Sequence, residues 1–152
     1  SEVVREGIQD VRGSLNRLRP GALEGRTLKD ALEKMIREYQ TLSNLQVDLH
    51  YEWVDVDMDV MIEDTIFRVI QESMTNAVRH GHASHMDLHF FEDEEDYMIE
   101  LQDNGVGFET LTYGYGLKQM MERISILGGQ LQFESRDGFF TRVSLPKYKE
   151  GR

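Results

Sequence analysis

Apolar residues recur three or four positions apart over three long stretches of the chain, which predicts three amphipathic helices. The first runs from about Thr27, a suitable N-cap, to Ser43, and the third runs from about Gly116 to Leu127, before Gly128-Gly129. The second is the longest, and its apolar positions are Ile62, Ile66, Val69, Ile70, Met74, Ala77 and Val78. We expect this second helix to lie against a sheet, with its polar side turned toward a cleft.

Apolar and polar residues alternate with a period of two in five other segments, which is typical of half-buried strands. These segments are 47–53, 86–90, 97–101, 130–135 and 139–145. Short turns at 92–96 and 136–138 connect consecutive strands, and Pro146 ends the last one. This order predicts an α+β fold, a two-layer α/β sandwich in which three helices cover one face of a mixed, mostly antiparallel five-stranded sheet.

The first twenty residues follow a different pattern. Their apolar residues are spaced alternately four and three positions apart, which predicts a helix with a heptad seam. These residues are Val4, Ile8, Val11, Leu15 and Leu18. Pro20 and Gly21 would end this helix. A narrow seam needs a partner helix, in a dimer or in a hairpin, although the helix could also fold back on its own domain. We therefore divide the chain into an N-terminal helix, 1–20, and a main body, 21–152.

The composition suits one globular domain of ordinary size, since 39% of the 152 residues are hydrophobic and 30% are charged. A formal net charge of -11 argues against nucleic acid as a partner, because phosphate contacts need clustered Lys and Arg. The absence of cysteine excludes disulfides and thiolate metal sites. We find no signal peptide and no apolar run of the roughly 20 residues that cross a bilayer. The chain as given is therefore expected to be soluble and intracellular, and it could be a fragment of a larger protein.

A polar stripe on the second helix is the main candidate site. Glu72, Asn76, Arg79 and His80 lie three or four positions apart, so they share one side of the helix. A carboxylate, a carboxamide and a cation in line indicate a site for a metal ion and a phosphate group.

Two glycine-containing motifs follow that stripe in the sequence. One, at the end of a predicted strand, is Asp103-Asn104-Gly105-Val106-Gly107, and the other, at the start of the third helix, is Gly114-Tyr115-Gly116-Leu117. Either one alone could be an ordinary turn. Glycine also lets a backbone approach a ligand closely, and the free N–H groups at a helix start suit a phosphate. The presence of the stripe and both motifs in one domain favours a shared site over unrelated turns.

In this order and spacing the motifs resemble the ATP-binding domain of the GHKL superfamily, which includes gyrase, heat-shock chaperone, histidine kinase and MutL ATPases. Within it the chain is most similar to sensor histidine kinases, over essentially its whole length. Two further segments resemble the short-lid subfamily that pairs with NarL-type response regulators, the DesK-, LiaS- and VraS-like kinases. They are Leu18-Arg19-Pro20, similar to the end of the dimerisation helices, and Gly116-Leu117-Lys118-Gln119-Met120-Met121-Glu122-Arg123 followed by Gly128-Gly129.

The resemblance implies the Bergerat ATP-binding fold, with Mg²⁺ and ATP bound in it. Asn76 would ligate the Mg²⁺, and Glu72 would polarise the attacking group or a water on the metal. Asp103 would accept a hydrogen bond from the adenine amino group, and Thr141 would hydrogen-bond nearby. The other residues that the resemblance places at the nucleotide are Arg79, His80, Gly105, Gly107, Gly114, Gly116 and Leu117.

Two positions depart from the family pattern. Phe140 stands where family members commonly carry a glycine, so we expect the local backbone or the wall of the pocket to differ. The lid over the nucleotide spans only Glu109 to Tyr113. Such short lids are normal in the subfamily, and we expect this one to be mobile.

The resemblance also implies partners outside the chain. The phosphoacceptor histidine would lie on a dimerisation segment upstream of Ser1, so this chain could not phosphorylate its own physiological residue. None of its histidines resembles a phosphoacceptor; they are His50, His80, His82, His85 and His89. The full-length protein would be a homodimer that pairs with a NarL-type response regulator. This domain would be cytoplasmic, within a protein that could be membrane-anchored.

Three other classes of protein stay open. An anti-sigma-factor serine kinase uses a similar sandwich, but the heptad helix and Leu18-Arg19-Pro20 favour a sensor kinase. A gyrase or MutL type of ATPase would bring a longer lid and transducer regions. A nucleotide-binding scaffold without turnover is the third class, and the presence of Glu72 and Asn76 counts against it.

Overall fold

Within its described residues, the chain forms three helices and five strands. The structure, a computed structural model, describes residue 23 and residues 25–54, 56–107 and 115–147. In chain order the elements are α2 (Leu28–Leu42), β1 (Gln46–Tyr51), α3 (Val60–Arg79), β2 (His85–Glu92), β3 (Asp96–Asp103), α4 (Tyr115–Ile126), β4 (Gln130–Ser135) and β5 (Phe139–Pro146). The three predicted amphipathic helices and the five predicted strands are therefore present, with small shifts at their ends.

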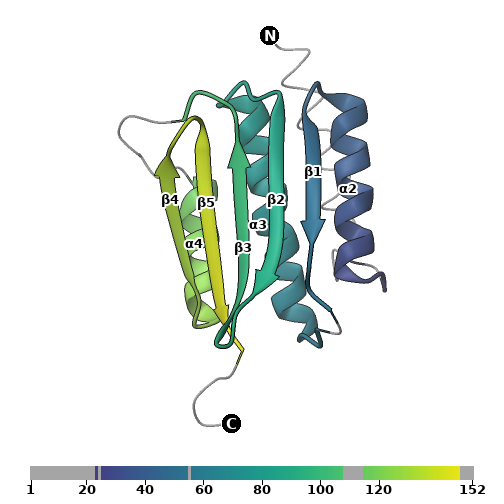
Figure 1. Ribbon diagram of the computed structural model, residues 1–152, viewed down its shortest axis with the longest axis vertical. Coiled ribbons are helices and arrows are strands. Elements are labelled where there is room, and N and C mark those ends of the chain that lie inside the picture. The colour runs from purple at the N-terminus through teal and green to yellow at the C-terminus, as the bar shows by residue number, and fades with distance from the viewer. Residues whose placement is uncertain (1–22, 24, 55, 108–114, 148–152) are drawn as a thin grey trace.

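The five strands form one mixed sheet in the order β1-β2-β3-β5-β4. β1 runs parallel to β2, and the other neighbouring pairs are antiparallel. Figure 1 shows α2, α3 and α4 behind the sheet, all on the same face. We call the other face, which no described helix covers, the open face. The prediction of an α+β sandwich with three helices on one face is confirmed.

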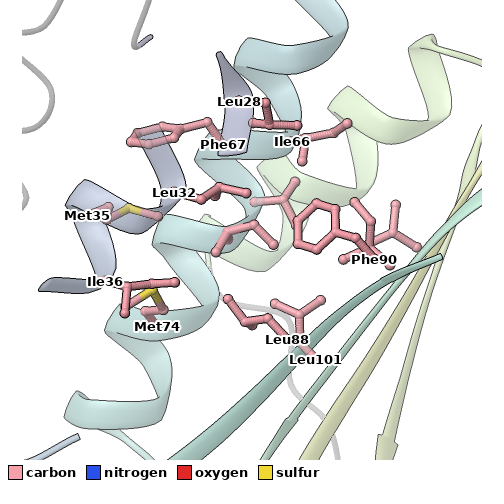
Figure 2. Packing of buried hydrophobic residues seen from close by; sticks show 14 of the residues in the cluster. Leu28, Leu32, Met35, Ile36, Ile66, Phe67, Met74, Leu88, Phe90 and Leu101 are labelled. Atoms are coloured by element: carbon pink, nitrogen blue, oxygen red, sulfur yellow. The ribbon is translucent and has the colours of Figure 1, made fainter. Parts of the chain in front are cut away.

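The hydrophobic core lies between the helices and the sheet. Figure 2 shows side chains of α2 and α3 meeting those of β2 and β3. Phe67 on α3 and Phe90 on β2 are the largest fully buried side chains of the described residues. Burial of a side chain of this size contributes about 1.5–3 kcal/mol. This packing holds α3 against the sheet and thereby positions the polar side of the same helix.

Capping side chains begin α2 and α3, and a glycine follows the end of α4. Thr27 caps α2, because its side chain accepts a hydrogen bond from the N–H of Asp30 at 3.1 Å. Asp59 caps α3 by accepting from the N–H of Met61 at 2.8 Å. Asp59 thus has a structural role, which we did not assign from the sequence. Gly128, with φ of +80°, ends α4 in the left-handed conformation that glycine adopts without strain.

The carboxylate of Asp93 stabilises the turn between β2 and β3 through hydrogen bonds that form only in the folded chain. Its Oδ1 accepts from the N–H groups of Asp96 at 2.7 Å and Glu95 at 2.9 Å. These two hydrogen bonds, first from Asp96 and then from Glu95, hold the pKa of the Asp93 carboxyl below its ordinary value of 3.8.

Asp93→Ala is therefore expected to lower Tm at pH 7. A group whose pKa is depressed on folding stabilises the protein above its unfolded pKa, and the contribution disappears as the pH falls through the folded value. The difference in Tm between the two proteins should be constant from pH 7 to about 5 and shrink below about pH 4. Thermal melts followed by circular dichroism measure it. A difference that stays the same down to pH 2.5 would contradict the assignment.

Some predictions concern residues outside the described part of the chain. These are the helix over 1–20 and its boundary with the main body, the lid over 109–113, and Gly114. They stay predictions. No helix among the described residues is both long enough and apolar enough to cross a membrane.

Candidate functional site

The loop that follows β3 lies directly against the C-terminal end of α3. A Cβ atom placed on Gly105 would lie 2.4 Å from the carbonyl oxygen of Gly81, so only glycine allows this approach. Next to it, the N–H of Val106 donates to the same carbonyl oxygen at 3.0 Å. The end of β3, with Asp103, is therefore held beside the helix that carries Glu72 and Asn76.

Asp103 is a buried carboxylate in a fixed orientation at the end of β3, with 5% of its surface exposed. Its Oδ1 accepts hydrogen bonds from the N–H groups of Gly105 and Phe139, both at 2.9 Å. Its other oxygen, Oδ2, accepts none from the described residues. Because two N–H groups already bond to Oδ1, Oδ2 is the oxygen that can accept from a donor group of a ligand.

The turn between β4 and β5 closes over Asp103 from the other side. Gly138 has φ of +133°, and a Cβ placed on it would lie 2.0 Å from the backbone oxygen of Asp103. Gly107, with φ of +68°, is equally restricted by Ser135, whose Oγ would lie 2.4 Å from a Cβ there. The observed neighbours of Gly105 and Gly107 are thus protein atoms. The predicted role of these two glycines, to leave room for a base, stays a prediction.

The polar stripe of α3 faces the start of α4. Glu72 and Asn76 are half-buried and one helical turn apart. A Cβ placed on Gly116 would lie 1.9 Å from Oε1 of Glu72, so the absence of a side chain at 116 leaves the space that this carboxylate occupies. The side chain of Asn76 makes no hydrogen bond to a described residue. An acidic and an amide oxygen donor are therefore placed together beside a helix N-terminus.

The last two members of the stripe lie at the end of α3. Arg79 is half-buried in the last turn and forms no ion pair with a described residue. His80 is the C-cap and is exposed. Leu117, the last residue of the second glycine motif, is half-buried and packs against the hydrophobic core. Arg79 is thus a cation available to an anionic ligand, whereas Leu117 has a structural contact in addition to its predicted role.

Thr141 and Phe140 lie on opposite faces of β5. Thr141 is 3% exposed, and because it pairs with Leu101 it lies diagonally across from Asp103 on the helix-covered face. Phe140 lies on the open face, where the guanidinium carbons of Arg136 and Arg142 stand 3.7 and 5.3 Å from its ring centre. The phenyl ring therefore does not form the wall around Asp103, the second of the two effects that we expected from this residue.

Asn104 is a positioning residue that our sequence analysis did not identify. Its Oδ1 accepts from the N–H groups of Ser84 and His85 at 2.9 and 3.0 Å, and its Nδ2 donates to Oγ of Ser84 at 2.9 Å. These bonds tie the loop after β3 to the segment that connects α3 with β2. The available signal was its place between Asp and Gly, since Asn in such turns commonly bonds to nearby backbone.

A family of known proteins matches more than half of the chain. The family described as histidine kinase-, DNA gyrase B-, and HSP90-like ATPase matches residues 61–149. That range begins in α3 and contains the described site from Glu72 to Thr141.

Several curated proteins are similar to this chain over most of its length. It is 36% identical over 147 residues to the signal transduction histidine-protein kinase/phosphatase UhpB of Salmonella typhimurium, covering 93% of this chain and 29% of UhpB. It is 30% identical over 143 residues to the sensor histidine kinase LiaS of Bacillus subtilis, covering 92% of this chain and 39% of LiaS. The chain therefore spans well under half of these relatives.

Solved structures share the fold. The chain superimposes on the histidine kinase AdeS of Acinetobacter baumannii with a TM-score of 0.69 and 19% identity, covering 80% of this chain and 64% of AdeS. For the ATP binding domain of PrrB from Mycobacterium tuberculosis the TM-score is 0.65 at 20% identity, covering 79% of this chain and 93% of that one. At these identities the likeness concerns the fold alone.

Proposed function

Because the chain belongs to the family of histidine kinase-, DNA gyrase B- and HSP90-like ATPases, we propose that it is the catalytic ATP-binding domain of a two-component sensor histidine kinase. It would transfer the γ-phosphoryl group of ATP to a histidine outside residues 1–152. The observation that carries the nucleotide part is Asp103, a buried carboxylate with one oxygen committed to backbone N–H groups. The kinase part is supported by relatives such as UhpB and LiaS, whose names are those of histidine kinases.

Asp103 would select adenine. The exocyclic amino group of adenine is a donor, and Oδ2 of Asp103 would accept from it. Guanine carries a carbonyl oxygen at the same ring position, which would face the carboxylate as a second acceptor. Gly105 and Gly107 would border the base, and Thr141, on the same face of the sheet as Asp103, would hydrogen-bond nearby.

The donor set on α3 fits Mg²⁺. Asn76 and Glu72 offer hard oxygen atoms on one side of the helix, and such donors are the ligands that Mg²⁺ prefers. Asn76 would hold the ion, which when bound supplies neutralisation of the phosphate charge. The phosphates would lie against Arg79, whose guanidinium has no ion pair among the described residues, and against the backbone of Gly114 and Gly116 at the start of α4. His80 and Leu117 would border the nucleotide.

The chemistry assigned to the protein itself is mainly positioning. A ring nitrogen of the acceptor histidine attacks the γ-phosphorus, a P–N bond forms, and the bond to the β–γ bridging oxygen breaks with its electron pair leaving on ADP. Glu72, on α3 beside Gly116, would orient and polarise the attacking imidazole. A site that holds both groups in line removes much of the entropic part of the barrier.

The remaining parts of the proposal concern the longer protein. Residues 1–20 would end a dimerisation helix and residues 21–152 would form the ATPase domain. The full-length protein would be a homodimer, and its phosphate would pass to a NarL-type response regulator. The domain would lie on the cytoplasmic side, where ATP is available.

Calorimetric titration with ATP, ADP and GTP, each with and without Mg²⁺, tests the nucleotide site. We expect ATP and ADP to bind at least about tenfold more tightly than GTP, since one hydrogen bond to a charged group contributes about 1.5–3 kcal/mol. The transfer step is tested by mixing the loaded chain with the separately produced phosphoacceptor segment of the same protein and measuring acid-labile phosphohistidine. Folded protein that binds no nucleotide would refute the proposal. Adenine-selective binding without any transfer would support a scaffold instead.

Gly116→Ala is expected to slow phosphoryl transfer about 10- to 100-fold while the melting temperature stays close to that of the wild type. The added methyl group would occupy the position of the Glu72 carboxylate, a flexible side chain that can move away. Displacement of a reacting group by about 1 Å is enough for a rate loss of this order. Single-turnover transfer with saturating ATP measures the rate. An unchanged rate would contradict the role given to Glu72, and a collapsed melting curve would show that the contact is structural.

A further inference from the structure

Paired acidic and histidine side chains gather on the open face of the sheet, which is the face opposite the polar stripe of α3. In the parallel pairing of β1 with β2, Asp48 lies opposite Asp87 and Gln46 lies opposite His85. Residues two apart on a strand share a face, so Asp48, His85 and Asp87 all project from the open face. Figure 1 views the sheet from this side, with β1 and β2 as neighbours.

The three side chains converge on a small volume. Nε2 of His85 lies 3.2 Å from Oδ2 of Asp48 and 3.2 Å from Oδ1 of Asp87. One ligand atom from each of the three residues lies within 4.8 Å of the other two. His50, two residues after Asp48 on β1, places its own Nε2 3.9 Å from Oδ1 of Asp87. Two carboxylates and one imidazole therefore converge, and a second imidazole, that of His50, stands beside Asp87.

These spacings match the ligand shell of a tetrahedral ion. Ligands at about 2.0–2.1 Å from a tetrahedral Zn²⁺ are separated from one another by about 3.3 Å. The 3.2 Å distances from His85 to both carboxylates are close to that value. A single N–H on Nε2, in contrast, can point fully at only one of the two oxygens.

The negative charges of the two carboxylates also favour a cation in this cluster. Asp48 and Asp87 are direct register partners, and like charges opposite each other on neighbouring strands destabilise a sheet. The chain as a whole carries a formal net charge of -11. The cluster is open to solvent, since side-chain exposure is 40% for His85, 49% for Asp87 and 62% for Asp48. His85 and Asp87 also line an open pocket of about 330 Å³, and Asp103 and Asn104 lie at the same pocket.

We propose that Asp48, His85 and Asp87, with His50 or a water molecule as the fourth ligand, bind a divalent transition-metal ion such as Zn²⁺. Imidazole and carboxylate together suit Zn²⁺, whereas Mg²⁺ prefers an all-oxygen shell. This site lies on the open face of the sheet, and the Mg²⁺ site proposed at Asn76 lies on the helix-covered side. The two sites can therefore be tested separately, and this proposal does not depend on nucleotide binding.

Titration of the untagged protein with ZnCl₂, in the absence of nucleotide, tests the site by calorimetry. We expect one Zn²⁺ per chain, with affinity at least about tenfold lower in His85→Gln and in Asp48→Asn, because even outer-shell changes weaken metal sites 10- to 100-fold. His89→Gln is the matched control. His89 lies on the same strand and face as His85 and pairs with Glu52. Its ring stands edge-on to that of His50, with ring centres 6.2 Å apart, but His89 is not one of the three residues whose ligand atoms converge. Its affinity for Zn²⁺ should stay within about twofold of the wild type.

Thermal melts give a second readout and verify folding. Zn²⁺ should raise the Tm of the wild type and of His89→Gln, because an ion that binds only the native state stabilises it, and should not raise that of His85→Gln. The proposal is overturned if folded wild-type protein binds no Zn²⁺, or if His85→Gln binds it as tightly as the wild type. Equal losses in His85→Gln and His89→Gln would also overturn it, because they would place the ion elsewhere on the face.

Discussion

Asp103→Asn is expected to weaken ATP binding about 10- to 100-fold while the protein stays folded. Asparagine keeps an oxygen for the N–H groups of Gly105 and Phe139, which lie 2.9 Å from Oδ1 in the native chain. The N–H groups of Gly105 and Phe139 fix the orientation of the new side-chain amide, with its oxygen toward them. In the reverse orientation the Nδ2 donor would face these two N–H donors. The Nδ2 group then takes the place of Oδ2 and faces the adenine amino group, so two donors meet.

The size of this effect follows from the bond that is lost. A hydrogen bond to a charged acceptor contributes about 1.5–3 kcal/mol, which corresponds to a factor of about 10 to 150 in affinity. Preference for ATP over GTP should fall by a similar factor. Calorimetry with both nucleotides measures the two affinities, and Tm reports the fold.

Glu94→Gln is the matched control for Asp103→Asn. It makes the same change from carboxylate to carboxamide at an exposed position in the turn between β2 and β3. That turn lies at the other end of β3 from Asp103, so ATP affinity should be unchanged. If the Asp103→Asn protein melts normally and binds ATP as tightly as the wild type does, Asp103 is not part of the nucleotide site.

Gly138→Ala is expected to destabilise the domain by about 3 kcal/mol or more and to abolish nucleotide binding. The φ of +133° at this residue is strained for any L side chain, which by itself costs about 1–3 kcal/mol. In addition, the new Cβ would lie 2.0 Å from the backbone oxygen of Asp103 and 2.9 Å from its Oδ1. Both neighbours belong to the proposed adenine site, so any relaxation moves the carboxylate.

Gly25→Ala separates the two causes. Gly25 also has a positive φ, +78°, but a Cβ placed there would meet no heavy atom within 4 Å. Only the backbone strain remains, and the expected loss is about 1–2 kcal/mol with ATP affinity retained. Urea denaturation at 25 °C compares the free energies of unfolding of both variants. If the free energy of unfolding of Gly138→Ala were no lower than that of Gly25→Ala, the close approach of residue 138 to Asp103 would not contribute to the loss of stability.

Much of the fold could be predicted from the sequence because its signals are local. The apolar spacing in α3 and the Thr27 cap of α2 depend on neighbours within a few residues, and both predictions are confirmed. The candidate site was predictable for the same reason, since Glu72 and Asn76 share a helix side through their spacing alone. That Asp103 ends a strand also followed from alternation.

Other features depend on pairing between distant segments, and the sequence pattern does not encode it locally. The spacing of Gly105 predicts a turn, but its contact with Gly81 depends on how β3 lies beside α3. Phe140 was compared with the family as a pocket residue, whereas the pairing of β5 with β3 turns its ring to the open face. Asn104 was only part of a motif until its bonds to Ser84 and His85 were observed.

The sequence by itself determined the helices and strands of the main body and the polar stripe of α3 that we propose as a phosphate and metal site, because these follow from the periodicity of side chains along the backbone. Only the tertiary structure decided the order β1-β2-β3-β5-β4, the fixed orientation of Asp103 and the meeting of Asp48, His85 and Asp87. The physical reason is register. A shift of one residue between β1 and β2 would turn the whole face of one strand over and separate the cluster, and register is set by the packing of the buried face.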